Sequence, residues 1–311
     1  MTQPLAVDAQ GLVKSFGTVR AVDGVSIRVA PGEVYGVLGP NGAGKTTFLR
    51  MLFGLIRPDA GTLLVRGRSW DADGTAVLDG VAGFVEAPRF YPYLTGRQNL
   101  VSLAKLDGAA RPGLIDDVLE TVDLAGRADR KVGGYSYGMR QRLGVAASLL
   151  REPRLLVLDE PANGLDPAGI RDMRALVKRL ADSGLTVLLS SHNMEEVEEI
   201  CDNVTIMKQG KVAFHGSISA LRAMAPDPGH LLDTADNPGA LALAAGHGVA
   251  VTDDESGALI VSGPSEVVAA YVADVVRAGI TLRQFTPTQT PLEALFFMLT
   301  DTGADRQEPT R

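Results

Sequence analysis

A nine-residue glycine-rich stretch constrains this chain more than any other feature. It reads Gly39-Pro40-Asn41-Gly42-Ala43-Gly44-Lys45-Thr46-Thr47. We expect an apolar strand just before it, at 33–38, and a helix with apolar residues at helical spacing just after it, at 45–55. Strand, glycine turn and helix in this order favour a phosphate-binding loop, because N–H groups of the turn and of the helix start face an anion. The stretch predicts a nucleoside triphosphate site, with Lys45 on the β- and γ-phosphates and the Thr46 hydroxyl on Mg²⁺.

The composition is that of a soluble globular protein large enough for one or two domains. The 311 residues are 45% hydrophobic and carry a net charge of −7, an acidic balance that argues against a nucleic-acid-binding surface. The single Cys201 excludes an internal disulfide and offers no metal-binding spacing. No apolar run approaches the ~18 residues that span a bilayer, and residues 1–10 lack a signal-peptide pattern. We therefore expect a cytoplasmic protein that reaches a membrane only through a partner.

Two aliphatic runs end in residues that suit phosphate chemistry. Residues 155–158 are followed by Asp159 and Glu160, and such a run is typical of a parallel strand buried on both faces. Ligands bind beyond the carboxyl ends of such strands, so both acids should face the phosphate loop. Since adjacent strand residues point opposite ways, one acid would hold Mg²⁺ and the other the attacking water. A neighbouring strand, 186–191, ends at His192.

Four other residues are weaker signals when taken singly. Phe16 lies at a turn between antiparallel strands expected within 5–30, where its ring could stack on adenine. Ser136 and Gly138 open a helix and form a second potential anion site. Asp166 ends a turn that leads into a helix at 168–183.

The remaining segments are expected to be a helical insertion and a small second domain. Residues 88–152 are predicted to be mainly helical, with helices from about 96 to 106 and at 113–126. Residues 217–311 begin with a breaker-rich linker and show no cluster of catalytic residue types. Strands are expected there at 230–234, 248–253, 258–262 and 280–286, and helices at 237–246, 264–278 and 291–299. The βαββαβ order predicts a ferredoxin-like unit, and residues from about 301 are expected to be disordered.

In order and spacing, six elements resemble the nucleotide-binding subunit of an ATP-binding cassette (ABC) transporter. They are Phe16, the phosphate loop 39–47, the signature loop 135–139, Asp159-Glu160, the loop 163–166, and His192. The resemblance covers residues 5 to about 216. It implies an α/β P-loop ATPase domain at 1–216 with a helical subdomain at about 88–152, and an accessory α+β domain at 217–311.

The resemblance also implies ATP and Mg²⁺ as cofactors and a role for each site residue. Glu160 would be the general base, His192 would link it to the γ-phosphate, and Lys45 would hold the phosphates. Metal ligands would come from Thr46, Asp159 and Glu86. The implied nucleotide-binding residues are Phe16, Gly39, Asn41, Gly42, Ala43, Gly44, Lys45, Thr46, Thr47, Glu86, Ser136, Gly138 and Asp166. In this family Ser136 and Gly138 cap a phosphate held by the opposite subunit, which implies a homodimer with ATP at the interface.

Two residues depart from the family pattern. Glu86 stands at the end of a strand expected at 81–86, where Gln is usual, and Tyr137 stands in the signature loop, where Gly is more common. A carboxylate beside phosphates must either ligate the metal or bind a basic group, so both alternatives stay open for Glu86. Because Ser136 and Gly138 are retained, we expect the signature loop to function.

Glu86, the run 90–96 and the signature variant narrow the resemblance to exporter ATPases of the bacitracin- and lantibiotic-resistance kind. Such subunits are separate chains that pair with a membrane permease, which would place this chain on the inner face of the membrane. One alternative is an ABC ATPase without a permease, acting on ribosomes or DNA, but those types carry two cassettes or long coiled coils. The other is an importer ATPase, which usually keeps the Gln that is Glu86 here.

Overall fold

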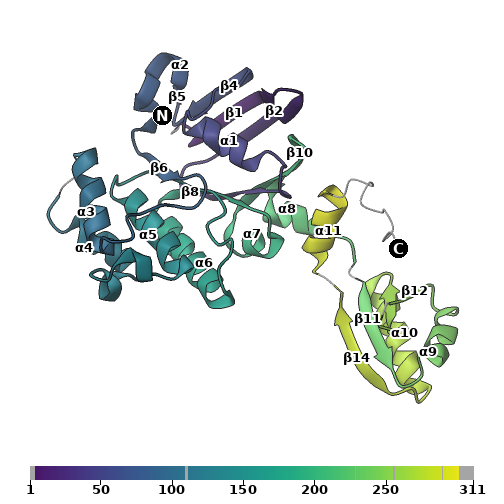
Figure 1. Cartoon of the computed structure of the whole chain (residues 1–311). Coiled ribbons are helices and arrows are strands. Elements are labelled where there is room, and N and C mark those ends of the chain that lie inside the picture. The colour runs from purple at the N-terminus through teal and green to yellow at the C-terminus, as the bar shows by residue number, and fades with distance from the viewer. Residues whose placement is uncertain (1–3, 109–110, 228, 255, 289, 301–311) are drawn as a thin grey trace. The chain divides into compact units, whose positions relative to one another are not determined.

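The chain divides into two compact units, Met1–Ile218 (unit 1) and Ser219–Arg311 (unit 2). The computed structural model describes residues 4–108, 111–227, 229–254, 256–288 and 290–300 (Figure 1). The tail expected to be disordered from about 301 lies outside the described residues. No helix in the described part of the chain has the length and apolar character needed to cross a bilayer.

An antiparallel sheet forms the first layer of unit 1. Its strands β1 (Val7–Phe16), β2 (Val19–Val29), β4 (Ala60–Val65) and β5 (Arg68–Ser69) lie in the order β2-β1-β4-β5. Alternate residues of β2, among them Val25, Ile27 and Val29, are buried. This period of two confirms the antiparallel strands expected within 5–30.

A six-stranded sheet forms the centre of unit 1. The strands are β10 (Lys211–Ser217), β9 (Asn203–Lys208), β3 (Val34–Leu38), β8 (Thr186–Ser191), β7 (Leu155–Leu158) and β6 (Val81–Phe84), in that order across the sheet. β9, β3, β8, β7 and β6 are parallel, and β10 pairs antiparallel with β9. β3, β7 and β8 are buried throughout, as aliphatic runs in parallel sheets are. Their carboxyl ends therefore meet at one edge of the sheet.

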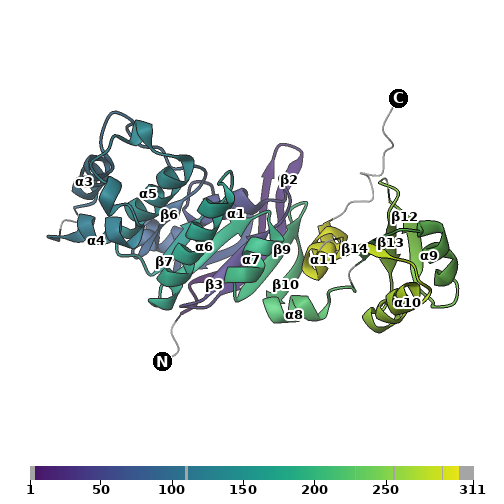
Figure 2. The same cartoon turned by 90° about the horizontal axis from the view of Figure 1, so that it is seen from below.

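Helices cover both faces of this sheet. Helix α1 (Lys45–Leu52) places Phe48, Leu49 and other apolar side chains in a core that also contains residues of the antiparallel sheet and of β3, β7 and β8. On the other face α6 (Pro167–Asp182) packs against β8, and α7 (Met194–Ile200) packs against β3 and β8 (Figure 2). A Cβ placed on Gly36 of β3 would lie 2.9 Å from Val197 of α7, so this strand approaches the helix closely.

The helical insertion is present but more broken than expected. It contains α3 (Gly96–Asp107), α4 (Leu114–Thr121), α5 (Tyr137–Leu149) and 3-10 turns at Ala125–Arg127 and Val132–Gly134. The single helix expected at 113–126 was wrong, because the helix stops at Thr121 and Asp123 takes a φ of 57°. Short elements at Trp70–Asp73 (α2) and Gly74–Leu78 (a 3-10 helix) were not expected, since four or five residues are too few to show a helical period.

Unit 2 has its own sheet and its own core. Its elements are β11 (His230–Thr234), α9 (Asn237–Ala244), β12 (Ala250–Asp253), β13 (Leu259–Ser262), α10 (Ser265–Arg277) and β14 (Leu282–Pro287). The antiparallel sheet has the order β12-β13-β11-β14. Leu232, Val261 and Tyr271 are among the fully buried core residues. The ferredoxin-like assignment of this unit stays a prediction.

Two further helices lie outside this sheet in the sequence. Helix α8 (Ile218–Ala223) lies at the division between the units, and α11 (Pro291–Thr300) is the last described element.

The pairing of β6 with β7 leaves no room for a side chain at Gly83. A Cβ there would lie 1.8 Å from the carbonyl oxygen of Val157, and Gly83 has a φ of 149°. We expect Gly83→Ala to lower the free energy of unfolding by about 3 kcal/mol or more, since overpacking forces backbone shifts. Urea unfolding followed by the fluorescence of the single tryptophan, Trp70, measures this in unit 1. Gly126→Ala is the control, because nothing lies within 4 Å of its Cβ position; equal stability of the two variants would contradict the expectation.

Candidate functional site

The loop 39–44 connects β3 to α1 and is shaped by glycines with different tasks. A Cβ on Gly39 would lie 2.4 Å from the carbonyl oxygen of Met207, and one on Gly44 would lie 2.3 Å from that of Ala21. Gly42 and Gly44 also have φ angles of 80° and 106°, which favour glycine. No side chain caps α1 at Gly44, so the first N–H groups of the helix are left to an anion.

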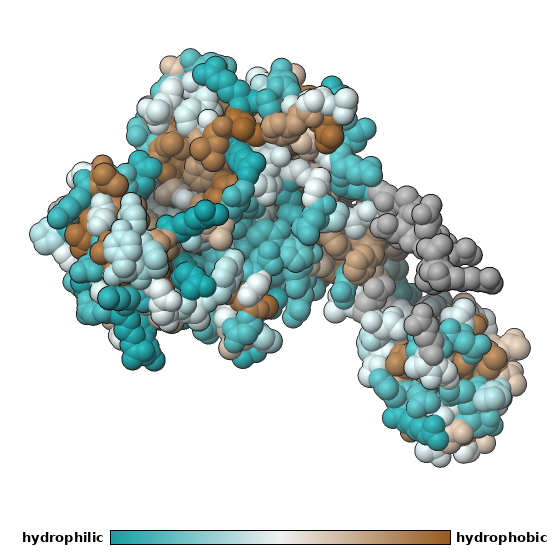
Figure 3. All heavy atoms as spheres, in the orientation of Figure 1, coloured by the Kyte–Doolittle hydropathy of each residue, from teal (hydrophilic) through white to brown (hydrophobic). Residues whose placement is uncertain are grey.

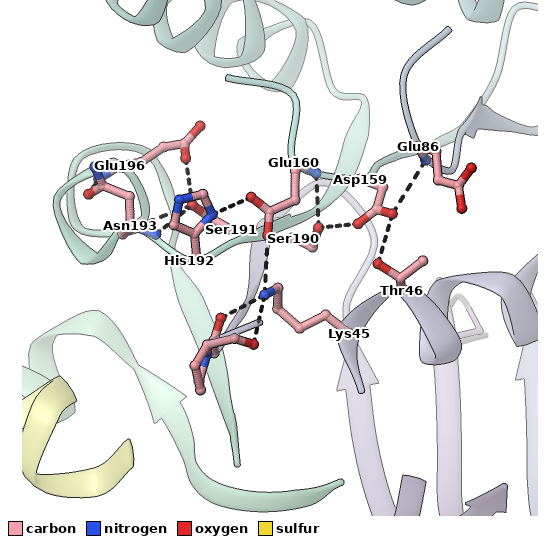
Figure 4. Close-up of polar contacts among 12 residues, drawn as sticks. Lys45, Thr46, Glu86, Asp159, Glu160, Ser190, Ser191, His192, Asn193 and Glu196 are labelled. Atoms are coloured by element: carbon pink, nitrogen blue, oxygen red, sulfur yellow. Dashed lines mark hydrogen bonds and ion pairs between the residues drawn. The ribbon is translucent and has the colours of Figure 1, made fainter. Parts of the chain in front are cut away.

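Lys45 holds its ammonium group inside this loop. The Nζ atom donates to the carbonyl oxygens of Gly39 at 2.6 Å and Pro40 at 3.3 Å, and it lies 3.1 Å from Oε1 of Glu160 (Figure 4). Only 5% of Lys45 is exposed. The three donors of the ammonium thus each have an oxygen partner, and they connect the loop after β3 to the acid after β7.

Asp159 follows the last residue of β7 and gathers hydroxyl groups from two elements. Its Oδ2 accepts a hydrogen bond from the Thr46 hydroxyl at 3.0 Å, and its Oδ1 accepts one from the Ser190 hydroxyl at 2.5 Å. Adjacent carboxylate and hydroxyl oxygens are a donor set that fits Mg²⁺. No group of three or more His, Cys, Asp or Glu able to hold a metal occurs among the described residues. Mg²⁺ characteristically needs only one or two carboxylates together with substrate phosphates, so these residues fit it.

Glu160 lies in a turn beyond the strand, with a φ of 49°. Its Oε2 lies 2.5 Å from Nδ1 of His192, its Oε1 faces Lys45, and its N–H donates to the Ser190 hydroxyl at 2.9 Å. The two acids were expected to diverge because neighbours alternate along a strand. That reason was wrong: the strand ends at Leu158, and the left-handed conformation of Glu160 follows it. The carboxylate, the imidazole and the ammonium come together as expected, since β7 and β8 are adjacent and parallel.

A buried carboxyl group lies behind His192. Glu196 is 6% exposed and its Oε2 lies 2.6 Å from the Ser191 hydroxyl oxygen. Burial raises the pKa of Glu196 above its ordinary value, against the opposing effects of the Ser191 hydrogen bond and the Arg174 charge. The Asn193 side chain accepts from the N–H of Glu196 and caps α7. These contacts fix the backbone on both sides of His192.

Glu86 lies beyond β6, which ends at Phe84 rather than at the expected residue 86. Its carboxylate forms an ion pair with Arg50 of α1, and its N–H donates to Oδ2 of Asp159 at 3.4 Å. The Glu86 side chain is 64% exposed, and its φ is 69°. The sequence left open whether Glu86 ligates the metal or binds a basic group, and in the structure it binds the basic group of Arg50.

The other expected nucleotide-binding residues belong either to the phosphate loop itself or to β1, α5 and α6. Phe16 ends β1 and is half exposed, with the Lys14 ammonium 5.7 Å from its ring centroid. Ser136 caps α5 by accepting from the N–H of Met139 at 3.2 Å. Asp166 caps α6 by accepting from the N–H of Gly169 at 3.2 Å. In the phosphate loop Asn41 is exposed, Ala43 is buried and Thr47 is half-buried on α1.

Three residues of this cluster were missed by the sequence reasoning. They are Ser190, which bonds both acids, Arg50, which pairs with Glu86, and Glu196, behind His192. Ser190 and Ser191 follow the aliphatic residues 187–189 of a fully buried strand, and two buried hydroxyls there were a usable signal. Arg50 gave a weaker one, as the only cation of α1 beyond Lys45.

Comparisons with known proteins identify the family of this chain. Residues 22–163 match the family model described as ABC transporter. The bacitracin transport ATP-binding protein BcrA of Bacillus licheniformis is 45% identical over 65% of this chain and 66% of its own length, just under two thirds. The daunorubicin/doxorubicin resistance ATP-binding protein DrrA of Streptomyces peucetius is 34% identical over 98% of this chain and 95% of its own length.

A solved structure shares the fold over most of the chain. It is cbiO1 from Clostridium perfringens, described as part of an ABC transporter complex, with a TM-score of 0.65 over 71% of this chain and 92% of that one. Its sequence identity is 24%, so this likeness shows the fold alone. The sequence identities with the bacitracin and daunorubicin proteins also show the family, and the match to DrrA extends along both units of the chain. The chain belongs to the family of ABC transporter ATP-binding proteins, and it is an ATPase.

Proposed function

We propose that this chain is the motor subunit of an exporter that drives a drug or an antimicrobial peptide through a separate membrane permease. The observation that carries the ATPase part is the cluster of Lys45, Glu160 and His192 at the edge of the parallel sheet. The export part is supported by relatives named for bacitracin transport, daunorubicin resistance and lantibiotic transport. The chain would then act at the inner face of the membrane, attached through the permease.

Hydrolysis needs a held triphosphate and an oriented water. The N–H groups of Gly39 and Ala43 already donate to carbonyl oxygens, so the other N–H groups of the loop, those of the first turn of α1 and the Lys45 ammonium would bind the phosphates. Phosphate oxygens then replace Glu160 as the partner of the ammonium. The carboxylate of Glu160 is then free to accept a proton from water, with His192 orienting it through Nδ1. Thr46 and Asp159 would hold Mg²⁺, which supplies positive charge to the transferring phosphoryl group.

The signature loop acts in a second copy of the chain. Ser136 and Gly138 lie at the start of α5, where their contacts are with the helical insertion and the loop 163–166. A 13-residue helix presents its N-terminal N–H groups and dipole there. We infer a homodimer in which this terminus completes the partner's ATP site, and ATP favours the closed pair because it binds that state more tightly.

The permease is expected to bind beside Glu86. A cavity of about 350 Å³ there is lined by residues of β6, of the end of α1 and of the helical insertion. They include the apolar Phe53, Phe84, Pro88, Phe90 and Leu103 and the charged Arg89, Asp107 and Arg151. Figure 3 shows hydrophobic residues gathered on this face between the antiparallel sheet and the helices α3–α5. Because β6 leads from this cavity to Glu86 and Asp159, a bound partner can act on the ATP site.

Glu160→Gln tests the general base. The variant is expected to bind ATP normally, to hydrolyse it about 10²–10⁴-fold more slowly, and to accumulate as a dimer with ATP, because the amide cannot accept the proton. Phosphate release in the presence of ATP and Mg²⁺ measures the hydrolysis rate, and light scattering under the same conditions measures the fraction of dimer. Glu120→Gln, an exposed change of the same kind on α4, is the control. Unchanged turnover would remove Glu160 from the chemistry.

Glu86→Gln tests whether this residue serves coupling. Its partner Arg50 is 40% exposed, and such pairs contribute at most about 1 kcal/mol, so we expect the Kd for Mg²⁺-ATP to change by less than about fivefold. The stimulation of ATPase by the permease in a reconstituted complex should change more than this. Arg50→Gln, which removes the other half of the pair, should have the same effect. A large loss of nucleotide affinity in Glu86→Gln alone would make the carboxylate a metal ligand instead.

Lys45→Ala in the host cell tests export. Loss of phosphate binding should abolish ATP-driven efflux, so cells that carry this allele should become more sensitive to a peptide antibiotic or an anthracycline. Minimal inhibitory concentrations of bacitracin, a lantibiotic and daunorubicin would be compared with those of the unaltered strain and of the Glu120→Gln strain. Unchanged sensitivity to all three would contradict the proposed substrate classes.

A further inference from the structure

The signature loop and the loop 163–166 touch each other within one chain. A Cβ placed on Gly164 would lie 3.6 Å from Cε1 of Tyr137, so the aromatic ring packs directly beside this glycine. A Cβ on Gly138 would lie 3.4 Å from Cδ2 of Leu165. Gly164 has a φ of 75°, so the loop turns back at the point where the ring covers it. Tyr137 thus supports the loop that follows Glu160.

The ring of Tyr137 is held from behind by its own helix. The side-chain amide of Gln141 is 2% exposed and donates to the Tyr137 hydroxyl at 3.0 Å. The Oε1 atom of Gln141 is buried and has no hydrogen-bond partner among the described residues. The bond to the Tyr137 hydroxyl is therefore the side-chain hydrogen bond that holds this amide in place. The Arg140 guanidinium lies 5.9 Å from the ring centroid. Tyr137 is itself 39% exposed, so the buried amide at its hydroxyl, the nearby cation and the contact with Gly164 are what orient the ring.

Backbone hydrogen bonds of the loop 163–166 connect the position of Gly164 to that of Glu160. The N–H of Asn163 donates to the carbonyl oxygen of Glu160 at 3.1 Å, and the N–H of Leu165 donates to that of Ala162 at 3.2 Å. Asp166 then caps α6. These two hydrogen bonds each span three residues and overlap, so a shift of the backbone at Gly164 is transmitted through Asn163 to Glu160, which is already in the left-handed region.

We propose that Tyr137 is a positioning residue that orients the Glu160 carboxylate of its own chain through the loop 163–166. This inference rests on the proposed dimer, in which the signature loop of one chain faces the ATP of the other. The signature loop and Glu160 of one chain then serve two different ATP molecules, and Tyr137 connects them. When the signature loop of one chain closes on the phosphate held by its partner, Tyr137 moves with it and orients the Glu160 carboxylate of its own chain. A glycine at 137 has no ring to make this contact.

Mixed dimers of the full chain test the direction of this effect. Two affinity tags select dimers in which one protomer carries Glu160→Gln, so that hydrolysis depends on the Glu160 of the other. Tyr137→Ala is placed either in the hydrolysing protomer (same-chain) or in the Glu160→Gln protomer (opposite-chain). We expect the same-chain arrangement to lower the single-turnover rate at saturating ATP about tenfold, because small misplacements of a catalytic group are costly. The opposite-chain arrangement should stay within about twofold, because Ser136 and Gly138 are intact there.

The outcomes separate this inference from the proposed function. A rate loss that is equal in both arrangements, larger in the opposite-chain one, or absent from both would overturn the role of Tyr137. Failure of Glu160→Gln chains to dimerise with ATP would instead overturn the two-chain site. Tyr93→Ala, a 64% exposed tyrosine in the same insertion, is the matched control and should leave both rates unchanged. If the thermal unfolding of Tyr137→Ala shows loss of folding, Tyr137→Leu, which keeps bulk but no planar ring, replaces it in the same comparison.

Discussion

The buried ammonium of Lys45 is the interaction on which the rest of the site depends. A charge in the protein interior is stable only when its hydrogen-bonding capacity is met by polar partners. Two carbonyl oxygens of the loop after β3 and the carboxylate of Glu160 meet it here. Because Glu160 also contacts His192, this one cation ties together the ends of β3, β7 and β8. A phosphate that takes over the ammonium therefore changes the partners of the acid and of the imidazole in a single step.

The sheet edge could be predicted because its residues follow continuous aliphatic runs. A run such as 155–158 is typical of a strand covered on both faces, and parallel strands bring their carboxyl ends to one side. That reasoning placed Lys45, Asp159 and Glu160 together, and it added His192 on the assumption that strands 155–158 and 186–191 are neighbours, which the pairing of β7 with β8 confirms. The glycine spacing of residues 39–44 did the same for the phosphate loop, since a Cβ on Gly39 or Gly44 would collide with a backbone oxygen.

The contacts that depend on register and turn geometry could not be predicted in this way. Ser190 meets Asp159 only because β8 pairs with β7 in one register, and the two residues are 31 positions apart in the sequence. The pairing of Arg50 with Glu86 depends on where β6 ends, and the sequence pattern placed that end two residues too late. The contact of Tyr137 with Gly164 likewise needs the positions of two loops whose sequences contain no apolar period.

The left-handed backbone of Glu160 opposes thermodynamic stability at the centre of the active site. A non-glycine residue in this region costs about 1–3 kcal/mol relative to glycine or asparagine, which adopt it readily. Random mutagenesis with selection only for heat resistance should therefore enrich glycine or asparagine at position 160, and the selected variants would be more thermostable and inactive. The chain tolerates this local strain because its hydrolytic carboxylate must stand between an ammonium and an imidazole, where an unstrained strand residue would not place it.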